Sequence, residues 1–259
     1  MIDKIIAIAN QKGGVAKTTT AINIATAMAA IGKKALIIDL DPQGNATTGL
    51  GVEKTNDGTN TISEALLGDA DINKIIQKTD VKGLFIAPAD ITLSAVEIEI
   101  DRTADYHFIL KNTLENIEEH FDICFIDCPP SLGFLTVNAL SAANSILIPL
   151  QCEFYALEGL SHLLQTHSMI SQNINPDLKI EGIVLTMYDK RNKLTEQVEE
   201  DVRNFLASSV YKTVIPRNVK LSEAPSHGKP VLIYDVNCSG SLAYIELAKE
   251  MLSKNVLAA

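Results

Sequence analysis

Short runs of apolar residues alternate with stretches of helical periodicity along almost the whole chain. Runs such as KIIAIAN and KALIIDL are dominated by Ile, Leu and Ala and do not alternate with polar residues. A strand of this composition is typical of a parallel sheet that is covered on both faces. Seven such strands are predicted, at residues 4–10, 34–40, 84–88, 122–127, 145–150, 179–186 and 210–215.

The stretches between these strands predict helices. Their residues are 17–31, 61–67, 103–119, 157–171, 195–207 and 241–252. Strands that are followed by helices indicate an α/β fold with a doubly wound, mostly parallel sheet flanked by helices. The segment 45–60 is rich in Gly, Thr and Asn and is predicted to be a mobile loop. No repeat or low-complexity linker divides the chain, so we expect a single domain over residues 1–259.

Length and composition suit a protein of this kind. The chain has 259 residues, of which 46% are hydrophobic, and this is enough for one large α/β core. No apolar run reaches the ~18 residues that a membrane span requires. The N-terminal sequence MIDKIIAIANQKGG runs into a glycine-rich loop without a cleavage site for a signal peptide. We therefore expect a cytoplasmic chain.

The charge distribution is uneven. A net charge of −10 argues by itself against nucleic acid as a partner. Residues 187–230, however, hold eight Lys/Arg and six Asp/Glu, a net charge of +2, which leaves −12 on the remainder. A solvated surface is the simplest interpretation of this segment, and a contact surface for nucleic acid is the alternative.

The sequence NQKGGVAKTT, at residues 10–19, lies between a predicted strand and a predicted helix. This is the context of a phosphate-binding P-loop. Its glycines let backbone N–H groups approach phosphate oxygens, and the helix that follows adds its positive N-terminal dipole. Lys17 would reach the β- and γ-phosphates, the Thr18 hydroxyl would bind Mg²⁺, and Thr19 would contact the α-phosphate.

The loop departs from the pattern G-x-x-x-x-G-K-[ST] at Gln11 and Ala16. It resembles the deviant Walker A motif, KGGVGKTT, of the ParA/MinD superfamily, in which the first lysine, here Lys12, reaches the partner subunit's nucleotide. Ala16 replaces the glycine of that motif. We expect a negative φ at Ala16, so that its methyl group is tolerated; a positive φ would strain the loop and weaken nucleotide binding. The resemblance implies ATP contacts by Lys12, Gly13, Gly14, Val15, Ala16, Lys17, Thr18 and Thr19.

Two acidic segments follow predicted strands, DLDPQGN from residue 39 and CFIDCPP from residue 124. Carboxylates at the carboxyl ends of parallel strands face the ligand site of a doubly wound fold. The segments resemble switch I and the Walker B strand with switch II of the same superfamily. The resemblance implies that Asp41 orients the attacking water, that Asp39 supports the Mg²⁺ shell and that Asp127 holds Mg²⁺ through water. Capping of a following helix is the alternative for each.

Two downstream segments indicate a branch of the superfamily. QCEFYALEG, at residues 151–159, and VIPRNVKLSEAPSHGKP, at residues 214–230, are similar to segments of the ParA/Soj family of DNA-partition ATPases, and the resemblance covers essentially the whole chain. It implies that Pro216 and Asn218 border the adenine ring, although capping and turn chemistry would also explain both. Arg191 and Lys220 match family positions for non-specific DNA contact, with Arg217 nearby as a weaker candidate.

The resemblance implies a Mg²⁺- and ATP-dependent homodimer that binds double-stranded DNA in its ATP state. A ParB-type centromere-binding partner would accelerate its slow hydrolysis, with Lys12, Lys17 and Asp41 as the catalytic residues. The protein would be cytoplasmic, associated with the nucleoid, and would segregate a chromosome or a plasmid.

Three alternatives remain open: a nucleotide-switched binding module with little hydrolysis, a MinD-like positioning ATPase and a small-molecule ligase that shares the fold. A MinD-like protein would carry a basic amphipathic C-terminal helix. Residues 241–259 hold Lys249 and Lys254 and neither Phe nor Trp. We therefore expect a docked terminal helix and no membrane partner.

Overall fold

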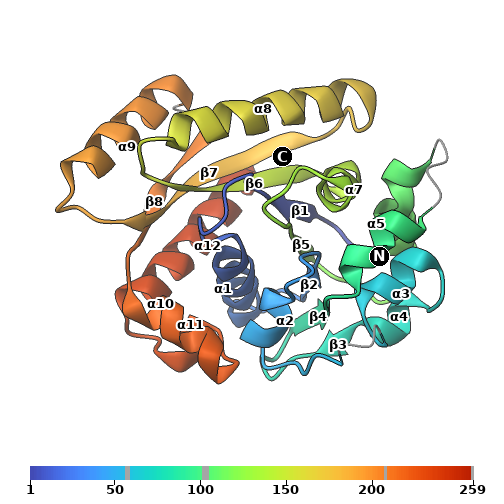
Figure 1. Cartoon of the computed structure of the whole chain (residues 1–259). Helices are drawn as coiled ribbons and strands as arrows, with labels where there is room; N and C mark the ends of the chain where they lie inside the picture. Colours follow the sequence, from blue (N-terminus) through green and yellow to red (C-terminus); the bar gives the residue numbers. More distant parts are fainter. Residues whose placement is uncertain (56–58, 101–104, 207–208, 258–259) are drawn as a thin grey trace.

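An eight-stranded sheet runs through the centre of the molecule, in a computed structural model that describes residues 1–55, 59–100, 105–206 and 209–257 (Figure 1). The strand order is β3-β4-β2-β5-β1-β6-β7-β8. All neighbours pair in parallel except β3 and β4. The strands are β1 Ile5–Ile8, β2 Ala35–Asp39, β3 Gln77–Lys78, β4 Leu84–Ala87, β5 Ile123–Asp127, β6 Ser145–Gln151, β7 Lys179–Tyr188 and β8 Val210–Pro216. The predicted doubly wound, mostly parallel sheet is confirmed.

Helices cover both faces of this sheet. On one face lie α1, α11 and α12, and on the other lie α7, α8 and α9, with α8 and α9 along the upper edge of the view in Figure 1. Alternate strand residues serve the two cores: Ile6 and Ile8 belong to the core beside α1, whereas Ala7 belongs to the opposite core. The uninterrupted apolar runs of the sequence therefore reflect burial on both sides.

The helices agree with the predicted ones in part. They are α1 Lys17–Ala30, α2 Asn45–Gly49, α3 Ile62–Leu67, α4 Ile72–Ile75, α5 Leu93–Glu99, η1 Tyr106–Phe108, α6 Ile109–Glu115, α7 Phe134–Ala142, α8 Ala156–Asn173, α9 Lys193–Leu206, α10 Val219–Glu223, η3 Ala224–His227, α11 Val231–Tyr234 and α12 Ser239–Leu257. The predicted helix at 103–119 is a 3₁₀ turn followed by a helix that ends at Glu115, and its residues 103–104 lie outside the described residues, as does residue 207 of the helix predicted at 195–207.

The loop predicted at residues 45–60 begins as helix α2, so this prediction is wrong for residues 45–49. The Thr47 side chain fixes this helix: its hydroxyl donates to Asp39 at 2.7 Å and accepts from the Ala89 N–H at 3.0 Å. A buried tertiary contact therefore holds a segment whose composition favours a loop. Residues 56–58 of the same prediction lie outside the described residues.

The C-terminal helix α12 is docked on the body of the molecule, as the sequence predicted. Tyr244, Leu247 and Met251 are fully buried, and the Tyr244 hydroxyl lies 3.1 Å from the Thr20 hydroxyl of α1. Within the part of the chain that the structure describes, no helix is both long enough and apolar enough to cross a bilayer.

Candidate functional site

The carboxyl ends of three central strands meet at one edge of the sheet. Strand β1 lies between β5 and β6, and β5 also pairs with β2, so that Asp39 stands opposite Asp127 in register. The chain leaves β1 through the predicted phosphate loop and enters α1 at Lys17. The fold therefore brings the three motifs, which are separate in the sequence, together in one site.

Lys17 is buried at the base of the phosphate loop. Its Nζ donates to the Lys12 carbonyl oxygen at 3.1 Å. Burial lowers the pKa of Lys17, while the nearby carboxylates of Asp127 and Asp41 act in the opposite direction, together with the Cys128 thiol. Among the described residues, the Lys17 ammonium is paired only with this carbonyl group, so it is favourably placed for an anionic ligand.

Other residues of the phosphate loop and of the start of α1 are held by hydrogen bonds or by their backbone conformation. Gly14 has a φ of +76°, a conformation that glycine adopts without strain. The Val15 carbonyl oxygen accepts from the Thr186 hydroxyl at 3.0 Å, and the Thr19 carbonyl oxygen accepts from Asn23 at 2.8 Å. The loop is therefore fixed to strand β7 through Val15, and the bond between Asn23 and Thr19 lies within α1.

Ala16 corrects one expectation. Its φ of 66° and ψ of 33° place it in the left-handed region, so the expected negative φ is wrong. The residue is the N-cap of α1, and its carbonyl oxygen already accepts the Thr20 N–H at 2.9 Å. An L-residue in this conformation costs about 1–2 kcal/mol because Cβ crowds the following carbonyl oxygen. The phosphate loop is consequently strained at this position.

Asp127 ends strand β5 and is fully buried. Neither of its carboxylate oxygens accepts a hydrogen bond from a described residue. Its pKa lies well above the usual range, first because of burial and then because of the Asp39 charge, while the nearby Thr18 hydroxyl acts in the opposite direction. A buried carboxylate that accepts no hydrogen bond from a described residue and lies beside a threonine hydroxyl supplies oxygen ligands that fit Mg²⁺.

Asp39 and Asp41 differ in what they contact. Asp39 is fully buried and accepts from the Thr47 N–H at 2.8 Å and from the Thr47 hydroxyl at 2.7 Å. Burial raises its pKa to about 6 against the effect of these bonds. Asp41 accepts the Gln43 N–H through one oxygen at 2.9 Å. Asp39 is thus held toward α2, and Asp41 has spare acceptor capacity beside Lys17.

Lys12 has a different position from Lys17. Its ammonium group forms an ion pair with the Glu153 carboxylate, and both side chains are about two-fifths exposed, at 40% and 44%. Sequence reasoning assigned no role to Glu153, although it lies in the quoted segment QCEFYALEG. The two residues are 141 positions apart, so no local pattern indicates the pairing.

The predicted adenine contacts lie at the start of α10. Asn218 is its N-cap: the side-chain oxygen accepts the Lys220 N–H at 2.8 Å, and the amide donates to Ser239 at 2.8 Å. Pro216 ends strand β8 opposite Tyr188. The capping that the sequence offered as an alternative is therefore present at Asn218, and a contact with a nucleotide base remains a prediction.

A close approach of two backbones joins this C-terminal segment to the segment after α2. A Cβ added to Gly51 would lie 2.9 Å from the Gly228 carbonyl oxygen, and a Cβ added to Gly228 would lie 2.8 Å from the Gly51 Cα. Both residues have a positive φ, +74° and +61°. Only glycine meets both requirements at these two positions.

The three predicted DNA contacts lie beyond the ends of β7 and β8. Arg191 has an exposed side chain (89%) and pairs with Asp189 at 2.8 Å. The Arg217 N–H donates to the Tyr188 carbonyl oxygen at 3.1 Å, which brings that residue to the same end of the sheet. Lys220 pairs with Glu223 at 2.8 Å. All three are surface residues of neighbouring segments, and two of them are paired within the chain.

Comparisons with known proteins agree with this geometry. A family model described as an AAA domain matches residues 3–180. The chromosome partitioning protein ParA of Caulobacter vibrioides is 53% identical over 253 residues, which cover 97% of this chain and 94% of that protein. The sporulation initiation inhibitor protein Soj of Bacillus subtilis is 53% identical over 248 residues, with coverages of 96% and 98%.

Solved structures resemble the whole chain. The cobyrinic acid a,c-diamide synthase of Mycobacterium smegmatis, with bound ADP and magnesium, has a TM-score of 0.82 at 36% identity, covering 97% of this chain and 94% of that one. The septum site-determining protein MinD of Pyrococcus horikoshii, complexed with Mg-ADP, has a TM-score of 0.79 at 25% identity, with coverages of 100% and 99%. Both neighbours bind a nucleotide with magnesium.

Proposed function

Because the chain belongs to the ParA/Soj family of chromosome-partitioning ATPases, we propose that it is an ATP-switched homodimer that binds double-stranded DNA without sequence preference. ATP joins two copies, and hydrolysis separates them. A ParB-type centromere-binding partner accelerates an intrinsically slow hydrolysis. The cycle segregates a chromosome or a plasmid on the nucleoid, in the cytoplasm.

The observation that carries this proposal is the different placement of two lysines in one loop. Lys17 is buried beside the acidic residues of its own site, whereas Lys12 lies at the surface and is paired with Glu153. A half-exposed ion pair contributes only about 0–1 kcal/mol, so Lys12 exchanges its carboxylate for a stronger anion at little cost. The triphosphate of a second copy is such an anion, because it carries several negative charges.

The other residues have roles that follow from their contacts. Thr18 and Asp127 would hold Mg²⁺, and Asp39 would support that shell by its charge while anchoring α2 through Thr47. The metal, when bound, neutralises charge on the β- and γ-phosphates. Asp41 orients the attacking water through its spare acceptor capacity, and Lys17 stabilises negative charge on the phosphates. Pro216 and Asn218 border the base.

DNA contact is assigned to Arg191 and Lys220, with Arg217 as a weaker candidate. The intramolecular partners of the first two, Asp189 and Glu223, offset the positive charge of these side chains in the monomer. Two copies side by side present both sets of cations, and phosphate-backbone binding needs no contacts with bases. The acidic remainder of the chain favours release of the monomer.

A salt series tests the proposal. Filter binding of double-stranded DNA is measured with Mg-ATP for the wild type and for Arg191→Ala/Lys220→Ala. If each copy contributes two cations, about four phosphates are neutralised, and the log–log slope against salt is roughly −3.6. The double variant should show a flatter slope and weaker binding on every sequence, with unchanged ATP-dependent dimerisation in light scattering. Lys111→Ala/Lys179→Ala is the matched control.

Two outcomes contradict the proposal. Equal affinity of wild type and double variant at every salt concentration removes these residues from the DNA site. DNA binding that is equally tight without ATP removes the switch.

A nucleotide-switched module with little hydrolysis is the second candidate, and the left-handed Ala16 favours it. Strain in the phosphate loop weakens nucleotide binding, and turnover falls with it. Phosphate release, with and without the centromere-binding partner, distinguishes the two candidates. Release that stays at the background level in both conditions supports the second one.

A further inference from the structure

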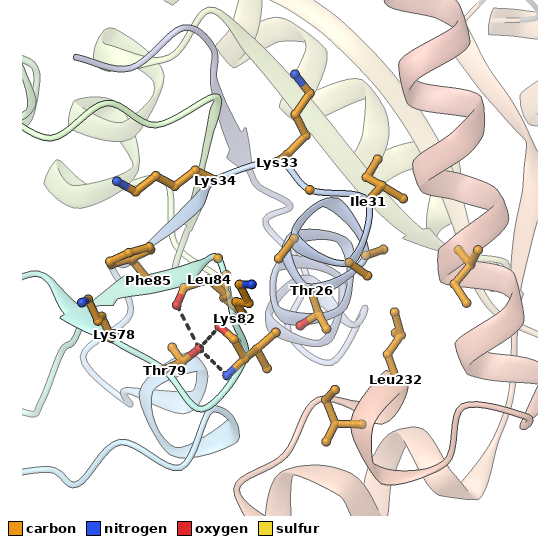
Figure 2. A pocket seen from close by; sticks show the side chains of 18 of the residues that line it. Thr26, Ile31, Lys33, Lys34, Lys78, Thr79, Lys82, Leu84, Phe85 and Leu232 are labelled. Atoms are coloured by element: carbon orange, nitrogen blue, oxygen red, sulfur yellow. Dashed lines mark hydrogen bonds between the residues drawn. The ribbon is translucent and has the colours of Figure 1, made fainter.

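A groove of about 990 Å³ lies at the end of α1 opposite the phosphate loop. Its lining comes from the last turn of α1, the β3–β4 hairpin, the α11 region and α12. Figure 2 shows α1 nearly end-on, with Ile31 and Leu232 on one side of the groove and Phe85 and Leu84 on the other. The groove is separate from every residue of the nucleotide site.

The floor of this groove is apolar and open to solvent. Ile31, Ile233 and Val236 line it, and their exposed fractions are 52%, 56% and 53%. Single exposed aliphatic residues are ordinary on protein surfaces, but three that line one groove, together with Leu232 and Ile245, form a contiguous patch. A patch of this kind, with a polar rim, is typical of an interaction surface.

The charged residues that line the groove are all lysines. Lys33, Lys34, Lys78 and Lys82 all line the groove, and no Asp or Glu is among the residues that line it. This gives four positive charges on a chain whose net charge is −10. In Figure 2 Lys78 and Lys82 lie on the hairpin side of the groove, whereas Lys33 and Lys34 lie on the segment between α1 and β2, with Lys33 above the end of α1.

Two of the four lysines already have acidic partners. Lys33 pairs with Asp122 at 3.0 Å, and Lys34 pairs with Glu119 and lies 5.2 Å from the centre of the Phe85 ring. Among the described residues, Lys78 and Lys82 form no ion pair and have exposed side chains. These two cations are therefore directly available to a bound anionic group.

We propose that this groove binds an acidic amphipathic helix of a partner protein. Apolar side chains at positions i, i+3/i+4 and i+7 of such a helix would contact Ile31, Ile233 and Val236. Its flanking carboxylates would meet Lys78 and Lys82. The charge complementarity selects an acidic partner, and the concave apolar floor, which a flat bilayer does not reach, selects a helix.

The position of the groove defines the consequence for function. It lies at the opposite end of α1 from Lys17, so an occupant leaves the phosphate loop free. The groove would anchor the protein to a second protein through the whole nucleotide cycle. This inference goes beyond the proposed function, since partition by DNA binding does not require it.

Fluorescence anisotropy with a defined probe tests the proposal. The probe is a labelled 20-residue peptide with Leu at helical spacing and Glu at the flanking positions, and a second peptide carries Lys in place of Glu. The wild type should bind the Glu peptide in preference to the Lys peptide. Lys78→Glu/Lys82→Glu and Val236→Asp should each weaken this binding at least tenfold. Lys111→Glu/Lys179→Glu changes the charge equally on other surfaces and should bind as the wild type does.

Phosphate release and ATP-dependent dimerisation, measured on the same samples, should be unchanged in all three variants, which separates this proposal from the proposed function. Equal binding by wild type, Lys78→Glu/Lys82→Glu and Val236→Asp overturns it, as does failure of the wild type to bind the Glu peptide. If phosphatidylglycerol vesicles bind the wild type, lose that binding in the same two variants and displace the peptide, a membrane is the ligand and the proposal is wrong.

Discussion

The two ends of helix α1 each form a candidate binding site, and the two sites differ in the burial and charge of their residues. At its N-terminus, Lys17, Asp39 and Asp127 are buried, and no described residue donates a hydrogen bond to Asp127. At its C-terminus, apolar side chains are exposed and lysines surround them. Buried unpaired charge is costly and is retained where a ligand compensates it, whereas an exposed apolar groove costs little until a partner covers it.

The largest expected effect is a loss of Mg-ATP affinity at the nucleotide end of α1. Lys17→Ala removes the buried ammonium that meets the phosphates and should weaken Mg-ATP binding by at least about 100-fold, as expected for truncation of one partner in a buried charge pair. Calorimetry measures the affinity. Lys82→Ala, at the groove end, should bind Mg-ATP as the wild type does. An unchanged affinity of Lys17→Ala would show that the loop does not bind phosphate.

Two carboxylates, Asp39 near the N-terminal end of α1 and Asp122 near the groove, should give opposite effects on the free energy of unfolding at pH 7.5. The pKa of Asp39 is raised to about 6, mainly by burial, so its ionised form destabilises the fold at pH 7.5; this penalty shrinks as the pH falls below 6 and is lost only near the ordinary pKa of the unfolded chain. Asp39→Asn, without Mg²⁺ or nucleotide, should therefore increase the free energy of unfolding at pH 7.5 by about 1–3 kcal/mol. The increase should shrink by pH 5 in urea unfolding.

Asp122 at the groove end serves as the control with the reverse sign. The Lys34 N–H and the Lys33 ammonium hold its pKa below the usual range. Its ionised form stabilises the fold, and that stabilisation is lost only as the pH falls through its low folded-state pKa. Asp122→Asn should be less stable than the wild type at pH 7.5 and at pH 5. The same sign for both variants at pH 7.5 would contradict the assignment.

The Lys12–Glu153 pair gives a smaller effect. Glu153→Gln removes the carboxylate that holds Lys12 within its own chain and should favour the ATP-bound dimer up to about fivefold, the range of an exposed ion pair. Sedimentation across an ATP titration measures the shift. Glu158→Gln, in the first turn of α8, is the matched control. Weaker dimerisation of Glu153→Gln would mean that Glu153 acts at the interface itself.

The smallest expected effect is the change in melting temperature when an alanine at either end of α1 is replaced by glycine. Ala16→Gly relieves the left-handed strain but adds backbone entropy to the unfolded chain, for a net gain of about 0.5–1 kcal/mol. The melting temperature should rise by about 2 °C. Ala30→Gly, at the last residue of the same helix, should lower it, because there glycine only loses entropy. A lower melting temperature for both variants would mean that Ala16 is not strained.

The sequence predicted the strands well and several helices poorly, for one physical reason. The strands are continuous apolar runs, which can be recognised in the sequence without knowledge of the tertiary contacts. Strands β1, β2 and β5 accordingly lie within the predicted ranges. Helix α7 is buried almost all round, which leaves no apolar stripe to detect. Helix α2 depends on the contact between Thr47 and Asp39, eight residues away.

In the candidate site, too, some residue positions follow from the sequence, whereas other features depend on how the chain packs. The positions of Lys17 and Thr18 follow from motif spacing within the β1–α1 unit, and that of Asp127 from its place at the end of a buried strand; their roles toward a nucleotide stay predictions. The pairing of Lys12 with Glu153 could not be predicted, because it depends on how the chain packs across 141 residues. The φ of Ala16 follows from the path of the loop between β1 and α1, and its sign is set by backbone geometry that residue type alone does not specify.

The contact between Gly51 and Gly228 has a mechanical consequence. Two backbones touch there without an intervening side chain, so no rotamer change absorbs a displacement of either segment. A displacement of the segment after α2 would therefore be transmitted directly to the segment that begins at Asn218. If the proposed contacts of Asn218 with the base and of Asp41 near the γ-phosphate hold, this backbone contact would couple the two ends of the nucleotide.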